Sequence, residues 1–209
     1  MTDAPWTPER LHEALRQHFG YEAFRDGQAE AILNLLAGRD VVLVMPTGSG
    51  KSLCYQLTAL LLPDVTVVVS PLIALMKDQV DALERQGIAA TFLNSSVDSA
   101  EMAYRLDGVR TGRYKLVYVA PERFRNRRFA DALAQARVSL FTVDEAHCIS
   151  QWGHDFRPDY LNLKRVLDKL NGVRVLAVTA TATPDVREDI VRQLGLGEPP
   201  REPPVVSVT

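Results

Sequence analysis

The chain has few cysteines, no long apolar run and no obvious targeting segment. Its two cysteines, Cys54 and Cys148, form no CxxC pair, so we expect reduced thiols without a disulfide framework or a zinc site. No apolar stretch approaches the ~20 residues that a membrane span needs, and no basic segment followed by an apolar one opens the chain. These absences favour a soluble intracellular protein that makes no contact with a membrane.

A strong charge of either sign is also missing. The net charge is −2 over 209 residues, so there is no overall attraction to nucleic acid, and binding of that kind must come from local patches. There is no internal repeat and no low-complexity tract. Apolar residues make up 46% and charged residues 24%, as in an ordinary soluble protein. The length suits one large domain better than two.

What is present is a regular alternation of apolar and amphipathic segments. Short apolar runs rich in β-branched residues are separated by helix-like segments and lie at residues 41–44, 65–69, 89–93, 116–119, 140–143 and 173–178. Strands that are apolar on both faces suit a parallel sheet covered by helices on both sides. The pattern predicts a doubly wound α/β domain whose ligands bind at the carboxyl ends of the strands.

The two ends of the chain carry further signals. Helices are expected over residues 7–18 and 25–37, which would put Arg25 and Gln28 on one face of the second helix because they are three residues apart. Residues 195–204 are rich in proline and predict a linker. We therefore expect one domain over residues 1–197, followed over residues 198–209 by the linker and the start of a new unit or one last strand.

Residues 45–52 are typical of a phosphate-binding loop. They follow an apolar strand and precede a helix, which is the context that gives a glycine-rich turn this meaning. The main-chain N–H groups of such a loop surround a phosphate, and the helix N-terminus adds partial positive charge. Lys51 would reach the β- and γ-phosphates and Ser52 a magnesium ion. Met45 replaces the usual first glycine, and the alternative is a simple turn followed by an exposed lysine.

An acidic pair, Asp144 and Glu145, directly follows the apolar run at residues 140–143. A carboxylate at the end of a strand beside a phosphate loop can hold magnesium. We therefore predict that Asp144 is a magnesium ligand. Glu145 is then placed to polarise the attacking water. The alternative is an acidic turn that caps a helix.

These motifs together resemble those of a known family. A phosphate loop, then Asp144-Glu145-Ala146-His147, then Thr179-Ala180-Thr181 resembles the superfamily 2 helicases of the DEAH-box type, which have two RecA-like motor lobes. Further segments resemble RecQ-family DNA helicases, namely residues 19–28, 70–79, 118–123 and 148–158. The resemblance covers about residues 7–197, and within this family the residue at the position of Met45 is variable. It implies a first RecA-like lobe of the P-loop NTPase type with a mostly parallel central sheet.

The resemblance implies an ATP site with magnesium. Tyr21 offers a flat face to a purine, while Arg25 and Gln28 offer donors and an acceptor to the adenine edge. Their alternative role is to cap and solvate a helix. The expected nucleotide contacts on the loop are Thr47, Gly48, Ser49, Gly50, Lys51 and Ser52, with Ser52 and Asp144 as magnesium ligands and Lys51, Asp144, Glu145 and His147 as the catalytic set. His147 would couple hydrolysis to DNA contact, although a structural histidine explains it nearly as well.

The resemblance also implies a single-stranded DNA sensor in residues 148–160. Aromatic side chains in a polar loop suit stacking on bases, and Arg157 adds charge. The alternative is that Trp152 and Phe156 plug a core, and Tyr160 fits a core residue better than a DNA contact. The residues expected to bind DNA or couple it to the nucleotide are Ser70, Pro71, Lys77, Asn94, Arg123, Gln151, Trp152, His154, Phe156, Arg157, Thr179 and Thr181.

The sequence thus predicts the motor lobe of a DNA helicase that uses ATP and Mg²⁺ to move 3′ to 5′ on single-stranded DNA and to unwind duplexes. Its expected partners are single-stranded and branched DNA, a second RecA-like lobe and C-terminal modules, without which the fragment should be nearly inactive. We expect it in the cytoplasm, associated with the bacterial nucleoid, or in the nucleus of a eukaryote. The alternatives are a nucleotide-gated nucleic-acid-binding or regulatory module without motor activity, and an unrelated phosphate-loop enzyme such as a small-molecule kinase.

Overall fold

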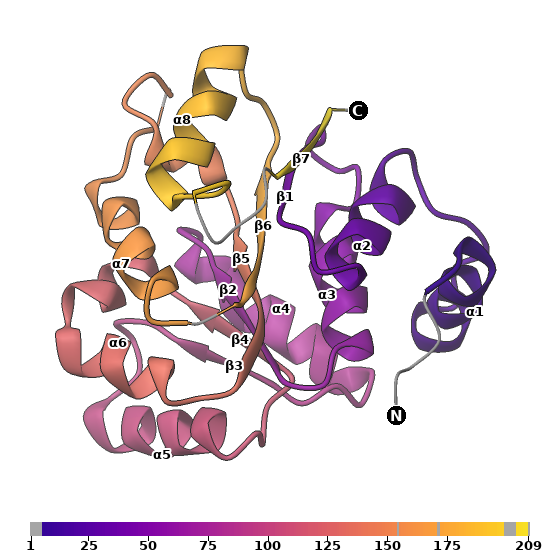
Figure 1. Cartoon of the computed structure of the whole chain (residues 1–209). Helices are drawn as coiled ribbons and strands as arrows, with labels where there is room; N and C mark the ends of the chain where they lie inside the picture. Colours follow the sequence, from indigo (N-terminus) through magenta and orange to yellow (C-terminus); the bar gives the residue numbers. More distant parts are fainter. Residues whose placement is uncertain (1–5, 154, 171, 199–203, 209) are drawn as a thin grey trace.

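A seven-stranded parallel sheet forms the centre of the protein (Figure 1). The computed structural model describes residues 6–153, 155–170, 172–198 and 204–208. The strands are β1 (Val41–Val44), β2 (Val65–Val69), β3 (Ala90–Leu93), β4 (Leu116–Val119), β5 (Val138–Val143), β6 (Arg174–Thr179) and β7 (Val205–Val208), in the order β3-β4-β2-β5-β6-β1-β7. This confirms the predicted parallel α/β architecture.

Helices cover both faces of the sheet. The α-helices are α1 (Pro8–Phe19), α2 (Gln28–Leu36), α3 (Lys51–Leu61), α4 (Ile73–Arg85), α5 (Ser99–Arg110), α6 (Arg127–Ala134), α7 (Leu163–Leu167) and α8 (Pro184–Leu194), and 3-10 turns span η1 (Pro121–Arg125), η2 (Ala146–Ile149) and η3 (Pro158–Asn162). One core joins α1 to α4 to the sheet and the other joins α5 to α8 to its opposite face. Figure 1 shows these two helical layers on either side of the strands, with α1 outermost in its layer.

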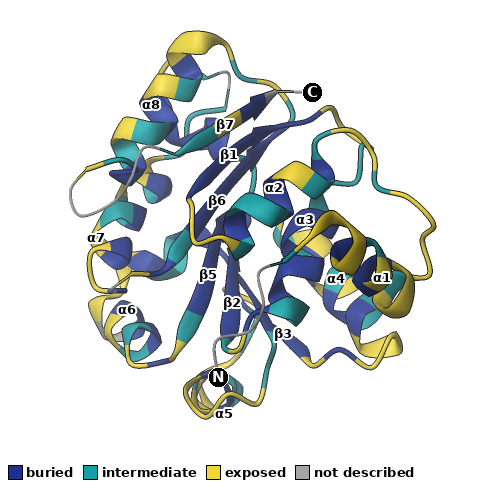
Figure 2. Ribbon diagram, turned by 45° about the vertical axis from the view of Figure 1, so that its right-hand side comes forward, coloured by how far each residue is buried: buried dark blue, intermediate teal, exposed yellow. Residues whose placement is uncertain are grey.

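The strands are buried on both faces because their side chains alternate between the two cores. In β1, Val41 and Leu43 pack into the core of α1 to α4, whereas Val42 packs into the core of α5 to α8. Figure 2 shows the inner strands largely buried, the edge strand β7 partly exposed, and the helices exposed on their outer sides. The candidate site lies at the carboxyl ends of these strands, beside the phosphate loop.

The first two helices are bounded by local signals. Thr7 accepts a hydrogen bond from the Arg10 N–H at 3.4 Å and so caps α1, which ends at Gly20 in the left-handed conformation. The second predicted helix is shorter than expected. Gly27 has a φ of 77° and starts α2 only at Gln28, so Arg25 precedes the helix and does not share a face of it with Gln28.

The segment after the proline-rich stretch returns to the sheet. Strand β7 pairs in parallel with β1, with Val41 opposite Val205 and Val44 opposite Val208. Of the two alternatives for this segment, the described residues form one last strand. Among the helices that the structure describes, none has the length and apolar character needed to cross a lipid bilayer.

Candidate functional site

The phosphate loop occupies residues 45–50, between β1 and α3. Gly48 and Gly50 have φ values of 78° and 87°, which L side chains rarely adopt. The Ser49 hydroxyl donates to the Pro46 carbonyl oxygen at 2.5 Å and closes the turn. The Lys51 ammonium donates to the carbonyl oxygens of Met45 and Pro46 at 3.2 and 3.4 Å. It therefore lies across the mouth of the loop, where a phosphate oxygen would replace these acceptors.

Arg25 and Gln28 hold the loop from the other side. The Arg25 guanidinium donates to the Gly48 carbonyl oxygen at 2.5 Å, and the Gln28 amide donates to the carbonyl oxygens of Ser49 and Gly50 at 3.2 and 3.0 Å. Gln28 is only 2% exposed. Both side chains thus order the phosphate loop directly, which is a contact that sequence reasoning had not assigned to them.

A hollow of about 470 Å³ opens next to this contact and is lined by Tyr21, Arg25, Gln28 and the loop glycines. Tyr21 is 55% exposed, and its ring lies parallel to that of Phe19 with 6.3 Å between the centroids. A planar ring with one open face beside polar groups can bind a flat heteroaromatic ligand. The structure therefore brings together the three residues that the sequence assigned to adenine.

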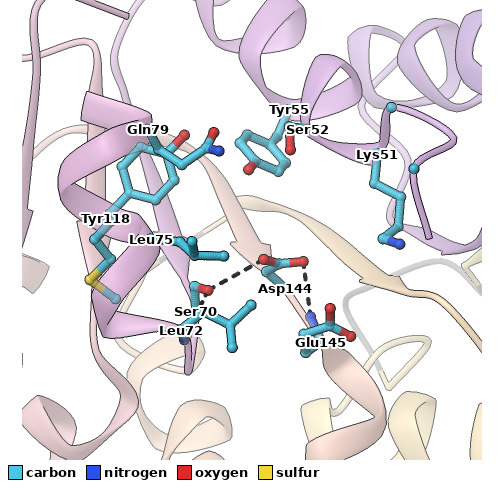
Figure 3. A pocket seen from close by; sticks show the side chains of 13 residues that line it. Lys51, Ser52, Tyr55, Ser70, Leu72, Leu75, Gln79, Tyr118, Asp144 and Glu145 are labelled. Carbon is cyan, nitrogen blue, oxygen red and sulfur yellow. Dashed lines mark hydrogen bonds between the residues drawn. The ribbon is translucent and has the colours of Figure 1, made fainter. Parts of the chain in front are cut away.

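A second hollow, of about 320 Å³, lies on the opposite side of the loop. Lys51 and Ser52 line it from the start of α3, and Asp144 and Glu145 line it from the end of β5. Figure 3 shows the Asp144 carboxylate between Ser70 and Lys51, with Glu145 next to it. These residues meet because the carboxyl ends of parallel strands share one edge of the sheet.

Asp144 is held by short-range contacts. Its carboxylate accepts a hydrogen bond from the Ser70 hydroxyl at 3.3 Å and one from the Glu145 N–H at 3.0 Å. Burial, followed by repulsion from Glu145, raises its pKa to about 6, although these hydrogen bonds and Lys51 act in the opposite direction. Two adjacent carboxylates, one of them largely buried, suit a bound cation, which would remove their repulsion.

Glu145 has a strained backbone. Its φ of 49° is the only positive value among the non-glycine residues that the structure describes. The left-handed turn brings the Glu145 carboxylate to 3.3 Å from Nδ1 of His147. Strain of this kind, about 1–3 kcal/mol, often marks residues whose orientation serves a function.

His147 joins the acidic pair to strand β6. It is buried, and its Nδ1 lies 2.8 Å from the Thr179 hydroxyl. The Thr179 hydroxyl also contacts the Thr181 carbonyl oxygen at 3.2 Å, and the Thr179 carbonyl oxygen accepts from the Met45 N–H at 3.0 Å. The phosphate loop, the acidic turn and the end of β6 thus form one connected polar network, in which Thr179 is buried and Thr181 exposed.

The aromatic-rich segment at residues 148–160 divides into exposed and buried parts. Trp152 is 77% exposed and Gln151 is also exposed, whereas Phe156 is half-buried. The exposure of Trp152 removes the alternative that it plugs the core. Tyr160 is fully buried, as its alternative role required. His154 lies outside the described residues.

Arg157 is tied to its own loop. Its guanidinium pairs with Asp155 Oδ2 at 2.9 Å, and its main-chain N–H donates to the Cys148 carbonyl oxygen at 2.8 Å. Because the side chain stays about 40% exposed, it remains within reach of a ligand that competes for it. The loop is thereby folded back on the segment that begins with Cys148.

The other residues expected to bind DNA differ in how far they reach the surface. Ser70 and Asn94 are buried, and Ser70 is used within the acidic site, as described above. The Asn94 side chain accepts from the Ser96 N–H at 2.9 Å and from its hydroxyl at 2.6 Å, while the guanidinium of Arg123 donates to the Asn94 carbonyl oxygen. Lys77 is exposed and pairs with Asp81, and Pro71 is half-buried.

Sequence reasoning missed a polar cluster whose members line both hollows: Tyr55, Gln79 and Tyr118 line the second, and Gln56 lines the first. The Gln56 amide donates to Gln79 at 3.3 Å and to the Tyr118 hydroxyl at 3.4 Å, and Tyr55 lies edge-on to Tyr118. Burial raises the pKa of both tyrosines, so they stay neutral donors. A single tyrosine in the otherwise aliphatic strand β4 was the available signal.

The chain is similar to known proteins along most of its length. Residues 25–190 match the family model described as DEAD/DEAH box helicase. The ATP-dependent DNA helicase RecQ of Bacillus subtilis is 51% identical over 88% of this chain and 32% of its own length. The RecQ helicase of Pasteurella multocida is 46% identical over 90% of this chain and 30% of its own length. The chain thus spans about a third of the length of the curated relatives it matches.

A solved structure supports the same fold. The Hef helicase domain of Pyrococcus furiosus superposes with a TM-score of 0.66 at 19% identity, over 92% of this chain and 39% of that one. At this identity the likeness concerns the fold alone, and it agrees with the predicted RecA-like architecture. From its matching family model and its relatives, the chain belongs to the DEAD/DEAH box helicases and, within them, to the RecQ family.

Proposed function

We propose that this chain is the first motor lobe of an ATP-dependent DNA helicase, which hydrolyses Mg-ATP to move 3′ to 5′ along single-stranded DNA and to separate duplexes. The observation that carries the proposal is the meeting of Lys51 and Ser52 with Asp144 and Glu145 in one hollow at the sheet edge. The direction of movement and the DNA substrate are inferred from the resemblance to the RecQ proteins of Bacillus subtilis and Pasteurella multocida, which are named ATP-dependent DNA helicases.

The residues around this hollow fit a magnesium nucleotide. Ser52 and Asp144 would hold the ion, whose charge would offset the negative charge that builds up on the phosphates. The raised pKa of Asp144 supports this assignment. It shows that burial and the neighbouring Glu145 disfavour the negative charge of Asp144, and a bound cation would stabilise that charge. Lys51 would exchange its loop carbonyls for phosphate oxygens, and the N–H groups around Gly48 and Gly50 would bind the same phosphates.

Glu145 is proposed to orient the attacking water and accept its proton. Its carboxylate lies 3.3 Å from Nδ1 of His147, which would fix its orientation. On the other side of the loop, Tyr21 would stack on the purine base while Arg25 and Gln28 contact its edge or continue to order the loop.

Single-stranded DNA is proposed to act through the segment at residues 148–160. Trp152 is exposed enough to stack on a base, which is worth about 1–3 kcal/mol. The path to the acidic pair is short, because the Tyr160 hydroxyl contacts the Asp144 carbonyl oxygen and Arg157 contacts that of Cys148. Lys77 and Arg123 would add contacts to the DNA backbone without reading its sequence.

The curated relatives are about three times as long as this chain. We propose that a second lobe supplies an arginine to the nucleotide, an effect worth about 10³–10⁵ in rate in other nucleotide hydrolases. Alone, this chain should bind ATP weakly, hydrolyse it very slowly and unwind nothing.

The proposed location is the cytoplasm of a bacterial cell. The alternative function is that of a nucleotide-gated binding module, which would bind the nucleotide in the same hollow without hydrolysing it.

The test compares two substitutions in the chain and in a version extended by its second lobe. Lys51→Ala should weaken binding of a fluorescent ATP analogue by at least about tenfold. Glu145→Gln should leave binding intact and lower DNA-stimulated hydrolysis in the extended protein by about 10²–10⁴. Hydrolysis that is unchanged in Glu145→Gln would favour the binding module, and unwinding by the 209-residue chain itself would contradict the need for a second lobe.

A further inference from the structure

Three side chains of different chemistry converge at the start of the aromatic-rich segment. The Sγ atom of Cys148 lies 3.8 Å from Nε2 of His147 and 3.7 Å from Oδ2 of Asp155, and one ligand atom from each residue lies within 4.8 Å of the others. Among the described residues this is the one group of three potential ligands within such reach. We propose that His147, Cys148 and Asp155 bind a thiophilic divalent cation of the Zn²⁺ type.

The spacing suits such an ion with little rearrangement. Zinc binds sulfur at about 2.3 Å and nitrogen or oxygen at about 2.0–2.2 Å, so a tetrahedral site separates its ligand atoms by roughly 3.4–3.6 Å. Two of the three separations are already within a few tenths of an ångström of this range. The third closes by rotation of Asp155, whose side chain is about half exposed. A nitrogen, a sulfur and an oxygen ligand would leave the fourth position to water.

The surroundings of His147 favour coordination through Nε2. Its Nδ1 lies 2.8 Å from the Thr179 hydroxyl and 3.3 Å from the Glu145 carboxylate. Histidines that bind metals commonly engage their second ring nitrogen with a carboxylate or another acceptor in this way, which fixes the ring and raises its basicity. The ring of His147 is thus oriented with Nε2 toward Cys148, as a ligand would be.

The charges around the site are mixed and decide how an ion would enter. Glu145 and Asp155 are acidic, whereas Arg157 pairs with the same Oδ2 of Asp155 at 2.9 Å. Cys148 and His147 are buried and Asp155 faces outward, so the ion would arrive from the side of Asp155 and displace Arg157 from it.

Binding must also release a proton. Burial, followed by the charge of Asp155, raises the pKa of the Cys148 thiol to about 12, so the empty site holds an S–H group. When the metal–sulfur bond forms, that S–H bond breaks and the proton passes to the solvent, so each ion bound displaces one thiol proton. The affinity should therefore rise with pH.

An ion at this position would also change the loop that carries Trp152 and Arg157. It would tie Asp155 to the turn after Glu145 and hold the loop in one arrangement, which predicts weaker stimulation of hydrolysis by DNA. This consequence rests on the proposed function, whereas the binding of the ion does not.

Cys54 offers a matched control. It is buried like Cys148, and burial likewise raises its pKa to about 12. It lies within α3 and is not part of the three-residue group. Removing either thiol changes the core by a similar amount, so only a loss confined to Cys148 reports a metal site.

The experiment titrates the chelator-treated chain with Co²⁺, then competes with Zn²⁺. A near-ultraviolet charge-transfer band diagnostic of a thiolate–cobalt bond should appear at one equivalent. It should persist in Cys54→Ser and vanish in Cys148→Ser. Cobalt at Asp144 would give no such band, because the residues that line that hollow include no cysteine.

Asp155→Asn is a second test in case the cysteine variant does not fold. It changes a half-exposed side chain without changing its size. It should weaken cobalt and zinc binding by at least about tenfold. The proposal is overturned if the native chain gives no thiolate band, if the band survives in Cys148→Ser, or if Asp155→Asn binds as tightly as the native chain. Since no nucleotide or DNA is present, failure here is distinct from failure of the proposed function.

Discussion

The Tyr160 hydroxyl donates a hydrogen bond of 2.9 Å to the main-chain carbonyl oxygen of Asp144. Tyr160 is fully buried and lies within η3, the turn that precedes α7, so this bond connects the end of the aromatic-rich loop to the acidic turn. The same side chain therefore has a packing role and a polar one. Its ring fills the core of α5 to α8, and its hydroxyl satisfies a carbonyl at the edge of the site.

Replacing Tyr160 by Phe should separate these two roles. The ring still fills its space, but the Asp144 carbonyl loses its buried donor, so the free energy of unfolding should fall by about 1–3 kcal/mol. Urea unfolding followed by circular dichroism measures the change. Tyr104→Phe is the control, because that residue is 56% exposed and should give no change. Equal stabilities of the Tyr160 variant and the native chain would show that the bond contributes nothing.

Most of the architecture could be predicted from the sequence, because buried parallel strands carry a strong local signal. The runs at residues 41–44, 65–69 and 116–119 coincide with β1, β2 and β4. The boundaries of the others differ by one or two residues, as for β5, which begins at Val138. The second helix was predicted too long because the pattern of apolar residues does not reveal the conformation of Gly27.

The contacts of the candidate site could be predicted only in part. Motifs identify which residues gather at the sheet edge, since strand ends align there. They do not reveal hydrogen-bond partners, because serine, asparagine and glutamine at strand ends have the same local pattern whether they face water or each other. The partners can lie far apart in the sequence. Ser70 contacts Asp144, which is 74 residues away, and Gln28 contacts Ser49 of the phosphate loop, which is 21 residues away. The exposure of Trp152 and the burial of Tyr160 likewise depend on long-range packing.

The two loop glycines should differ in their tolerance of a side chain. Both have positive φ, so replacement by alanine costs about 1–2 kcal/mol at either position. A Cβ at Gly50 would also lie 2.8 Å from the Gln28 amide nitrogen, whereas one at Gly48 meets nothing within 4 Å. Moving Gln28 would break its two hydrogen bonds to the loop, each worth about 0.5–1.5 kcal/mol.

Gly50→Ala should therefore unfold at a lower urea concentration than Gly48→Ala. Its free energy of unfolding should be lower by about 1–3 kcal/mol. The double variant with Gln28→Ala offers the internal control, because removing the amide removes the clash. In that background the two alanine variants should be equally stable. A difference that persists without Gln28 would mean that the backbone strain at Gly50, and not its neighbour, is responsible.

Trp152 should matter for DNA but not for folding. Because the side chain is largely exposed, Trp152→Ala should change the free energy of unfolding by less than about 0.5 kcal/mol. The loss of one stacked base should weaken binding of labelled single-stranded DNA by about 1–3 kcal/mol, measured by fluorescence anisotropy. Tyr104→Ala, which removes an exposed aromatic side chain from α5, should leave DNA binding unchanged. Equal losses in both variants would rule out a specific contact.

Asp189 should make stability depend on pH. It is buried on α8, where its carboxylate accepts from Arg192, from Gln193 at 3.3 Å and from the Ser150 hydroxyl. Burial alone would raise its pKa, but these hydrogen bonds outweigh it and hold the pKa below the ordinary value. A depressed pKa in the folded state means that the charged form stabilises the fold at pH above the unfolded value of about 3.9, and that this contribution is lost as the pH falls below it.

Asp189→Asn should therefore be less stable than the native chain by about 1–3 kcal/mol at pH 7. The gap between the two should narrow as the pH falls below about 3.9, because the carboxylate of the unfolded chain is protonated there before that of the folded protein. It should close once the pH has passed the depressed pKa of the folded state. Urea unfolding at a series of pH values measures the gap. Asp185→Asn, at an exposed position of the same helix, controls for the loss of charge near the helix start. A gap that stays constant down to acid pH would mean that the charge of Asp189 contributes nothing and that only the shape of its side chain matters.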